Sequence, residues 1–556
     1  MSIGEVLLEK ELITADNLAE ALALRKKTGS RLDKILVELG HVSEQQVFGV
    51  MSEQLGMEMV DLTEVSIDVE TLRALPPKLV YRRGLVPLTK ENGTLRVATA
   101  DPFDLYCFDE VRMLTGLEIQ PVLACSDDID KVIKTYYGVG GETIEEMMDS
   151  NDVEVLGNPS GDTEDLLEMA QEASVIKLVN EFFLEALKER ASDIHIEPYE
   201  RDLKIRYRID GVLQETVVPP QIRKFQAAII SRIKIMSQLN IAEKRLPQDG
   251  RISLQVGGRQ IDVRVSVIPM LFGEGVVMRL LDKSTVMFTL PQLGMAEDTF
   301  QDFHQLIARP HGIVLVTGPT GSGKTTTLYA ALHEIVSPAI KVVTIEDPVE
   351  YDLEGVNQIH VKPKIGLTFA RGLRHILRHD PDVVMIGEIR DLETAEAAVQ
   401  AALTGHLVFS TLHTNDAASS TTRMLDMGVE PFLVTSTVEA AMAQRLVRTI
   451  CPECREEYEA DPDKLPSDSH IVAGQKLFRG AGCRKCRGTG YHGRTGLFEL
   501  MTTSESIREC VMRRAPAGEV LAAAKADGLR LLREDGWMKV REGVTTPEEI
   551  IRSTKA

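Results

Sequence analysis

The chain has 556 residues, of which 43% are hydrophobic and 26% charged, a composition typical of about three to five soluble globular domains. Its net charge of −21 argues against the broad cationic surface that non-specific nucleic-acid binding requires, so we expect no nucleic-acid partner. No apolar run approaches the ~20 residues of a membrane-spanning helix, and an acid near the N-terminus argues against a secretory signal. We therefore expect a cytoplasmic protein that reaches a membrane only through a partner.

The N-terminal region contains an internal repeat. The segment 7–18 returns 29 positions later as the segment 36–47. In the second copy, Ser43 and Gln46 can form a capping box that starts a helix. Repetition of one helical unit predicts a small N-terminal helical repeat domain, residues 1–60, that serves docking or ligand sensing rather than catalysis.

Mixed elements and then an acidic stretch follow the repeat. Residues 61–138 are predicted to form a small α/β domain, with a turn and strand at 93–99 and a helix at 104–114. Residues 138–176 contain eleven acids and no Lys or Arg. Because like charges repel and little apolar surface is available, we expect a flexible acidic linker over 139–170.

A second α/β domain is predicted over residues 171–290. An apolar-periodic helix opens it, and strands follow, of which the one at 203–209 is the most informative. Its period of two places Lys204, Arg206 and Arg208 on one face. That face is either solvated or directed at a phosphate in a neighbouring subunit.

The segment 291–450 contains a complete phosphate-binding loop. The pattern G-x-x-x-x-G-K-[ST] lies between a buried strand at 312–317 and a helix that begins near 326, which is the context the loop requires. Backbone N–H groups would cradle the phosphates of ATP, Lys324 would reach the outer phosphates, and Thr325 would coordinate Mg²⁺. The candidate nucleotide-binding residues are Gly318, Pro319, Thr320, Gly321, Ser322, Gly323, Lys324, Thr325 and Thr326.

Acids follow two further apolar strands of this segment. One acidic turn ends at Glu350, a candidate site residue, and a later strand ends at Glu388. Acids at the carboxyl ends of strands in an α/β core lie at the ligand crevice, so Glu388 is the candidate for polarising the attacking water. The alternative is that Glu388 only pairs with Arg390 or Arg423. Gly387 stands where many ATPases have a Mg²⁺-associated Asp.

Two histidines flank the next strand, at positions 406 and 413. A histidine at a strand end can hydrogen-bond a γ-phosphate or Glu388 and report the nucleotide state. His406 and His413 are therefore candidate site residues. The alternative for His413 is a polar core residue whose hydrogen bonds are satisfied.

Two C-x-x-C pairs follow the predicted core. Cys451, Cys454, Cys483 and Cys486 would close a tetrahedral Zn²⁺ site without an open position, which indicates a structural role. A redox pair is the less favoured alternative. We assign residues 451–500 to a tetracysteine zinc-binding subdomain and 501–556 to a C-terminal helical region.

The sequence resembles the bacterial secretion and pilus-assembly ATPases, the family that includes the type II secretion motor and the type IV pilus extension motor. The resemblance covers almost the whole chain and rests on the phosphate loop, the histidine box and four further segments, 191–198, 247–251, 346–350 and 387–391. It also explains Gly387, because members of the family typically have glycine before the catalytic Glu.

The resemblance implies a multi-domain α/β fold, with a RecA-like P-loop ATPase core and a smaller PAS-like α/β domain. It implies a homo-hexameric ring in which ATP binds between the second domain and the core. Arginines of the smaller domain would reach the nucleotide, and the candidates are Arg206, Arg208, Arg223 and Arg251. A polytopic inner-membrane platform protein would convert hydrolysis into extrusion of pilin-like subunits.

Several functions compete within and beyond this family. Type II secretion is favoured over pilus extension, because the segments 369–374 and 427–433 look more like the secretion branch. A DNA-translocating ring ATPase is disfavoured by the acidic charge. A scaffold that does not hydrolyse ATP is disfavoured by the intact phosphate loop and Glu388.

The N-terminal repeat resembles the tandem domain that binds cyclic di-GMP in some of these motors, but its pattern is incomplete. Residues 2–4 are Ser-Ile-Gly where Arg-Leu-Gly is expected, and Asp33 stands where a glycine is expected. Arg25 replaces a glutamine that Gln54 retains in the second copy. The lost arginine and glycine weaken the case for phosphate contacts. We therefore favour docking to a membrane-anchored partner over cyclic di-GMP binding.

Overall fold

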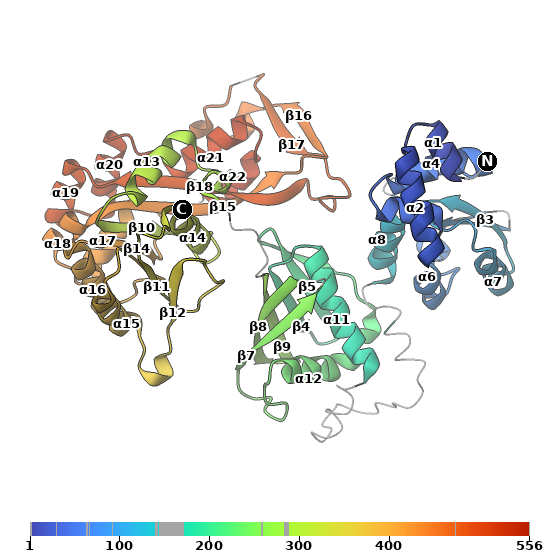
Figure 1. Ribbon diagram of the computed structural model, residues 1–556, viewed down its shortest axis with the longest axis horizontal. Coiled ribbons are helices and arrows are strands. Elements are labelled where there is room, and N and C mark those ends of the chain that lie inside the picture. The colour runs from blue at the N-terminus through green and yellow to red at the C-terminus, as the bar shows by residue number, and fades with distance from the viewer. Residues whose placement is uncertain are drawn as a thin grey trace. The chain divides into compact units, whose positions relative to one another are not determined.

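The computed structural model describes residues 3–28, 31–62, 65, 67–91, 93–138, 143, 172–256, 259–282, 288–472 and 474–554. The chain divides into two compact units, Met1–Asp282 and Lys283–Ala556 (Figure 1). None of the helices in the described residues combines the length and apolarity that crossing a membrane requires. The acidic linker predicted over 139–170 lies outside the described residues, apart from Thr143.

The N-terminal repeat is confirmed as a pair of matching helical units. Its helices are α1 (Ile3–Glu9), α2 (Ala15–Thr28), α3 (Leu32–Glu38) and α4 (Glu44–Leu55). The bounds of α3 repeat those of α1 with the predicted offset of 29 residues. The predicted capping box is present at α4, where Ser43 accepts from the backbone N–H of Gln46 and the Gln46 side chain accepts from that of Ser43.

A small α/β domain follows the repeat and confirms the strand and helix predicted there. Its elements are α5 (Val69–Leu72), α6 (Pro77–Arg83), β1 (Leu85–Glu91), β2 (Thr94–Thr99), α7 (Leu105–Thr115), β3 (Glu118–Leu123) and α8 (Ser126–Tyr137). The sheet has the order β1-β2-β3, in which β1 and β2 are antiparallel and β2 and β3 are parallel. Asp104 caps α7 by accepting from the backbone N–H of Cys107 at 3.1 Å.

The second domain is a six-stranded antiparallel sheet covered by helices. Its elements are α11 (Ala173–Lys188), β4 (Asp193–Pro198), β5 (Leu203–Ile209), β6 (Val212–Thr216), the 3₁₀ turn Pro220–Phe225, α12 (Gln226–Met236), β7 (Gln248–Val256), β8 (Arg259–Met270) and β9 (Gly273–Asp282). The strand order is β6-β5-β4-β9-β8-β7, and α11 and α12 share one buried apolar cluster with the sheet. In β5, Leu203, Ile205 and Tyr207 are buried and the residues between them are not, so the predicted alternation is confirmed.

A seven-stranded sheet forms the centre of the second unit. Its order is β12-β11-β13-β14-β10-β15-β18, and all neighbours are parallel except β15 and β18. The strands are β10 (Gly312–Thr317), β11 (Val342–Glu346), β12 (Val356–His360), β13 (Val383–Ile386), β14 (Leu407–Leu412), β15 (Val438–Ile450) and β18 (Tyr491–Thr502).

Helices cover both faces of this sheet, as the burial of a parallel sheet requires. In β10, Ile313 and Leu315 belong to one apolar cluster, whereas Val314 and Val316 belong to another. The helices are α13 (Glu297–Ile307) and α14 (Lys324–Ile335) on one face, and α15 (Phe369–Ile376), α16 (Leu392–Leu403), α17 (Ala418–Asp426) and α18 (Pro431–Thr437) on the other.

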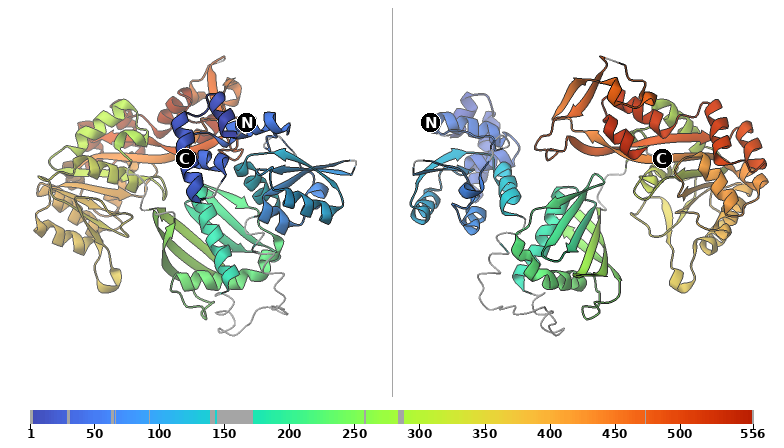
Figure 2. Two further views of the ribbon diagram at one scale, coloured as in Figure 1. Left: turned by 45° about the vertical axis from the view of Figure 1, so that its right-hand side comes forward. Right: turned by 180° about the vertical axis from the view of Figure 1, so that it is seen from behind.

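The cysteine-rich region is an insertion between two strands of the central sheet. It contains β16 (Arg455–Glu459) and β17 (Lys476–Gly480), an antiparallel hairpin that projects beside β15 and β18 (Figure 2). Most of β18 lies in the segment 451–500 predicted as the zinc subdomain, yet β18 joins the core sheet by pairing with β15. The chain ends in the helices α19 (Glu505–Met512), α20 (Ala517–Ala526), α21 (Leu532–Arg541) and α22 (Pro547–Ser553).

Candidate nucleotide site and metal centre

The phosphate loop connects β10 to α14 at the carboxyl edge of the central sheet. Gly318 and Gly323 have φ of 149° and 89°, values that side chains rarely tolerate. A Cβ on Gly318 would lie 2.5 Å from the Gln444 carbonyl oxygen, and one on Gly323 would lie 2.9 Å from Nε2 of the same glutamine. The glycines therefore let the loop approach β15 closely.

The polar groups of the loop fit a phosphate chain. The Lys324 ammonium is buried and donates to the carbonyls of Gly318 and Pro319 at 2.8 and 3.0 Å. Burial lowers the pKa of Lys324 to about 8, partly opposed by the charge of Glu388. The buried hydroxyl of Ser322 has no protein partner. A desolvated cation beside an unsatisfied hydroxyl is the arrangement that an anion would complete.

Glu388 follows β13 at the same edge and contacts two basic side chains. Its Oε1 lies 2.5 Å from Arg390, and its Oε2 lies 3.2 Å from Nε2 of His413. The carboxylate is 12% exposed. The alternative that Glu388 pairs with Arg390 describes an observed contact, but the same carboxylate also reaches His413. The structure thus brings together two of the predicted site residues.

The two histidines lie at opposite ends of β14. His413 follows the strand at the carboxyl edge, whereas the His406 carbonyl accepts from the N–H of Gly312 at the start of β10. At about 3.3 Å per residue, the strand separates them by roughly 20 Å. His406 Nδ1 lies 2.8 Å from the Ala401 carbonyl oxygen, within hydrogen-bonding distance. His406 is therefore not brought to the phosphate loop of its own chain.

The acidic turn after β11 is held by a buried hydrogen-bond cluster that the sequence did not indicate. Glu346 is buried and accepts from Tyr329, from Thr344 at 2.5 Å and from Gln358 at 3.1 Å. The Tyr329 oxygen in turn accepts from the backbone N–H of Glu350 at 3.3 Å. Burial, together with the charge of Glu346, raises the pKa of Tyr329.

This cluster connects the candidate Glu350 to the helix that begins with Lys324. Burial raises the pKa of Tyr351 in the acidic turn, partly opposed by Thr326 in the first turn of that helix. Thr325, the predicted Mg²⁺ ligand, is half-buried beside it. Tyr329 was missed because its role depends on a strand 17 residues later in the chain, and no local motif marks it.

Three of the four candidate arginines of the second domain form contacts within that domain, and the fourth is exposed. Arg206 donates to Glu197 at 2.6 Å, and Arg208 donates to the Gly211 carbonyl at 3.1 Å and lies 3.6 Å from Asp193. Arg223 donates weakly to the Phe272 carbonyl at 3.4 Å. Arg251 is exposed on β7. Their ion pairs hold Arg206 and Arg208 on one face of β5.

The four cysteines of the C-x-x-C pairs form one cluster. Their sulfurs all lie within 4.8 Å of one another, and the pairs 451–483 and 454–486 are 3.7 Å apart. Cys486 accepts from the N–H groups of Cys483 and Gly490 at 3.0 and 3.2 Å. Although burial opposes ionisation, these N–H groups lower the pKa of Cys486 to about 7. The donor set fits a thiolate-ligated metal ion.

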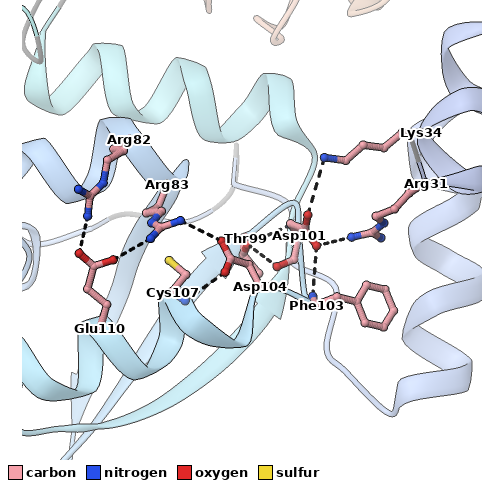
Figure 3. Close-up of polar contacts among 10 residues, drawn as sticks. All are labelled: Arg31, Lys34, Arg82, Arg83, Thr99, Asp101, Phe103, Asp104, Cys107 and Glu110. Carbon is pink, nitrogen blue, oxygen red and sulfur yellow. Dashed lines mark hydrogen bonds and ion pairs between the residues drawn. The ribbon is translucent and has the colours of Figure 1, made fainter. Parts of the chain in front are cut away.

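Arg31, in the N-terminal region, pairs with two acids, of which Figure 3 draws Asp101. Its guanidinium pairs with Asp33 at 2.7 Å and also with Asp101, and it lies 4.6 Å above the Phe103 ring. Lys34 lies 3.7 Å from Asp101. Asp33, the residue that replaces the expected glycine, and Asp101 thus both pair with the arginine that could otherwise contact a phosphate.

Comparisons with known proteins match nearly the whole chain. Residues 168–552 match the family described as Type II/IV secretion system protein, and residues 55–143 match the MshEN domain. Type II secretion system protein E of Xanthomonas campestris pv. campestris is 46% identical, covering 100% of this chain and 98% of that protein. Type IV pilus assembly ATPase PilB of Myxococcus xanthus is 42% identical, covering 99% and 98%. Type II secretion system ATPase E of Vibrio cholerae serotype O1 is 53% identical, covering 73% and 80%.

Proposed function

This chain belongs to the family of type II/IV secretion system proteins, and we propose that it hydrolyses ATP at the loop 318–325 to drive extrusion of pilin-like subunits at the inner membrane. It is a secretion-system ATPase. Full-length identity is 46% to a type II secretion protein E and 42% to a pilus assembly ATPase. Type II secretion is therefore the function, with type IV pilus extension as the alternative.

The observation that carries this proposal is the position of the Glu388–His413 pair at the same sheet edge as the phosphate loop. In phosphoryl transfer the protein contributes mainly positioning and charge stabilisation. Glu388 would orient the attacking water, and His413 would hold that carboxylate and respond to the γ-phosphate. Lys324 would neutralise the outer phosphates, and Mg²⁺, bound by Thr325 and the phosphates, would supply further positive charge.

We propose that the catalytic unit is a homo-hexameric ring built from a RecA-like core and a PAS-like second domain. Arginines of the second domain would reach the nucleotide of an assembled site. The face of β5 supports this role because it places Arg206 and Arg208 on one side of the strand; each pairs with an acid, Glu197 or Asp193, that a phosphate would have to replace. Guanidinium groups in such positions can meet the charge that develops on a transferred phosphoryl group.

The tetracysteine cluster is proposed to hold one structural Zn²⁺. Four thiolates leave no open coordination position, so the ion would stabilise the insertion and take no part in hydrolysis. The N–H groups that donate to Cys486 would stabilise its thiolate as a ligand. The hairpin β16–β17 would depend on this ion for its fold.

The N-terminal region is proposed to dock on the cytoplasmic part of a membrane-anchored partner. Five large apolar side chains are exposed on α7 and the turn before it: Phe103, Leu105, Tyr106, Met113 and Leu114. Apolar surface of this kind commonly marks an interaction site. Because Arg31 already pairs with Asp33 and Asp101, cyclic di-GMP remains the less favoured ligand. Such docking, together with the platform protein, would place the ATPase peripherally on the inner membrane.

The test is a comparison of ATPase activity with different partners. The purified full-length chain is assayed alone, with DNA, and with vesicles that contain the platform protein. We expect activity to rise with the platform protein and to be unaffected by DNA. Stimulation by DNA without a response to the platform protein would favour a nucleic-acid translocase instead.

A further inference from the structure

Arg445 lies beside the phosphate loop, although no motif points to it. β15 pairs with β10 as far as Ala443 opposite Thr317, so the next two residues of β15 extend alongside the start of the loop. Gln444 accepts from Thr327 of α14 at 2.8 Å. Arg445 NH1 is 3.1 Å from the point that a Cβ on Gly318 would occupy.

The Arg445 guanidinium is held by neutral oxygens. It donates to the Gln444 carbonyl at 3.0 Å, and to the carbonyl and side-chain oxygens of Asn415 at 2.9 and 3.3 Å. Within the described residues, no carboxylate forms an ion pair with it inside 4.0 Å. Asp416 and Glu499 act on it only over a longer range. A half-buried cation is thus fixed in place without a direct counter-charge.

The charge of Arg445 also affects Lys324 in the phosphate loop. Burial lowers the pKa of Arg445, and its positive charge contributes to the lowered pKa of Lys324. These two cations therefore repel each other across the loop. Bringing like charges together in a partly desolvated site is costly unless an anion joins them.

Arg445 also connects the loop to the turn that carries His413. Asn415 lies two residues after His413, and the intervening Thr414 hydroxyl is 2.7 Å from that of Thr317, the residue before the loop. A ligand that contacts Arg445 would therefore also affect the turn that carries His413, the residue in contact with Glu388. This connection lies within a single chain.

We propose that Arg445 is a second cation of the nucleotide site, contacting the phosphate chain of the ATP bound by the loop of its own subunit. The inference rests on the proposed nucleotide site at 318–325. It differs from the proposed contribution of the second-domain arginines, because it needs no neighbouring subunit. A planar guanidinium suits the role, since it presents several donors to phosphate oxygens and stays charged at neutral pH.

The experiment measures equilibrium affinity for a fluorescent ATP analogue with Mg²⁺ in full-length protein carrying Glu388→Gln, which we expect to prevent turnover. Arg445→Gln keeps hydrogen-bonding capacity and removes the charge, whereas Arg445→Lys keeps the charge. Arg513→Gln, at an exposed arginine after α19, is the matched control. Lys324→Ala reports on the loop itself. Thermal unfolding of each nucleotide-free variant is recorded in parallel.

We expect Arg445→Gln to weaken binding at least about tenfold, Arg445→Lys to restore most of it, and nucleotide-free Tm to change little. Affinity within twofold of the parent in Arg445→Gln would overturn the proposal. Equal losses of affinity in both Arg445 variants together with a lowered Tm would also overturn it, because that pattern indicates a structural role of Arg445 rather than a phosphate contact. If Lys324→Ala bound the analogue normally, the nucleotide site itself would be misassigned and both proposals would fail.

Discussion

His413 Nε2 lies 3.2 Å from Oε2 of Glu388, while the other oxygen of that carboxylate is 2.5 Å from Arg390. Both partners follow Glu388 in the chain: Arg390 lies two residues later, and His413 lies in the turn after β14. Together they fix the carboxylate at the carboxyl edge, where a water beside the γ-phosphate would be oriented. Loss of the carboxylate should therefore reduce ATP turnover while ATP binding persists.

Glu388→Gln should retain ATP and lose hydrolysis. The amide preserves the shape of the side chain but cannot accept the proton of the attacking water, so we expect turnover to fall by about 10²–10⁴-fold. Steady-state ATPase rates and the affinity for a fluorescent ATP analogue check this directly. Lys324→Ala, which should abolish productive binding, is the contrasting variant. Near-normal hydrolysis by Glu388→Gln would show that another group positions the water.

ATP affinity should depend on pH through Lys324. Its pKa is lowered to about 8 in the free protein by burial, and bound phosphates would raise it, so binding favours the protonated form. The charge of Lys324 then contributes fully to ATP affinity below pH 8. Above pH 8 the ATP affinity should fall by about tenfold per pH unit, until the pKa of Lys324 in the complex is reached. Titrations between pH 7 and 9.5 measure this. Lys324→Arg, which stays charged, should give a flatter profile; a flat profile in the parent would contradict the assignment.

One Zn²⁺ per chain should be found in protein purified without added chelator. Chelation or Cys486→Ser should destabilise the insertion that contains β16 and β17, because closed thiolate sites contribute folding energy. Nucleotide affinity should persist, since the loop 318–325 belongs to a different part of the sheet. Cys510→Ser, at a buried cysteine outside the cluster, is the control. Metal-free protein with a normal Tm and intact thiols would refute the assignment.

ATPase activity should require assembly. Specific activity should rise with protein concentration, and Arg208→Ala should lower turnover while the nucleotide affinity of the monomer changes little. Arg208 is only partly buried and its carboxylate partner is 3.6 Å away, so its loss should cost little stability. Arg201→Ala, at an exposed position of the same domain, is the matched control.

Mixing variants tests the shared site more sharply. Arg208→Ala subunits have an intact phosphate loop, and Lys324→Ala subunits have an intact arginine. If the site is built by neighbouring subunits, the mixture should hydrolyse ATP faster than either variant alone. Activity that is independent of concentration and insensitive to Arg208→Ala would rule out a shared site.

Much of this protein was determined by the sequence alone, because the relevant residues are close together in the chain. The phosphate loop, the paired cysteines and the 29-residue helical repeat are local patterns. So is the cationic face of β5, since alternation along a strand follows from the backbone itself. Such features could be predicted before any tertiary contact was known.

Other features were decided only by the order of strands in the central sheet. β15 lies next to β10, which brings Arg445 to Gly318 across more than a hundred positions of the chain. The same arrangement places β18 in the core sheet and brings Tyr329 to Glu346. The strand direction also separates His406 from His413. These contacts depend on which apolar strands bury one another, and hydrophobic pattern alone does not specify that pairing.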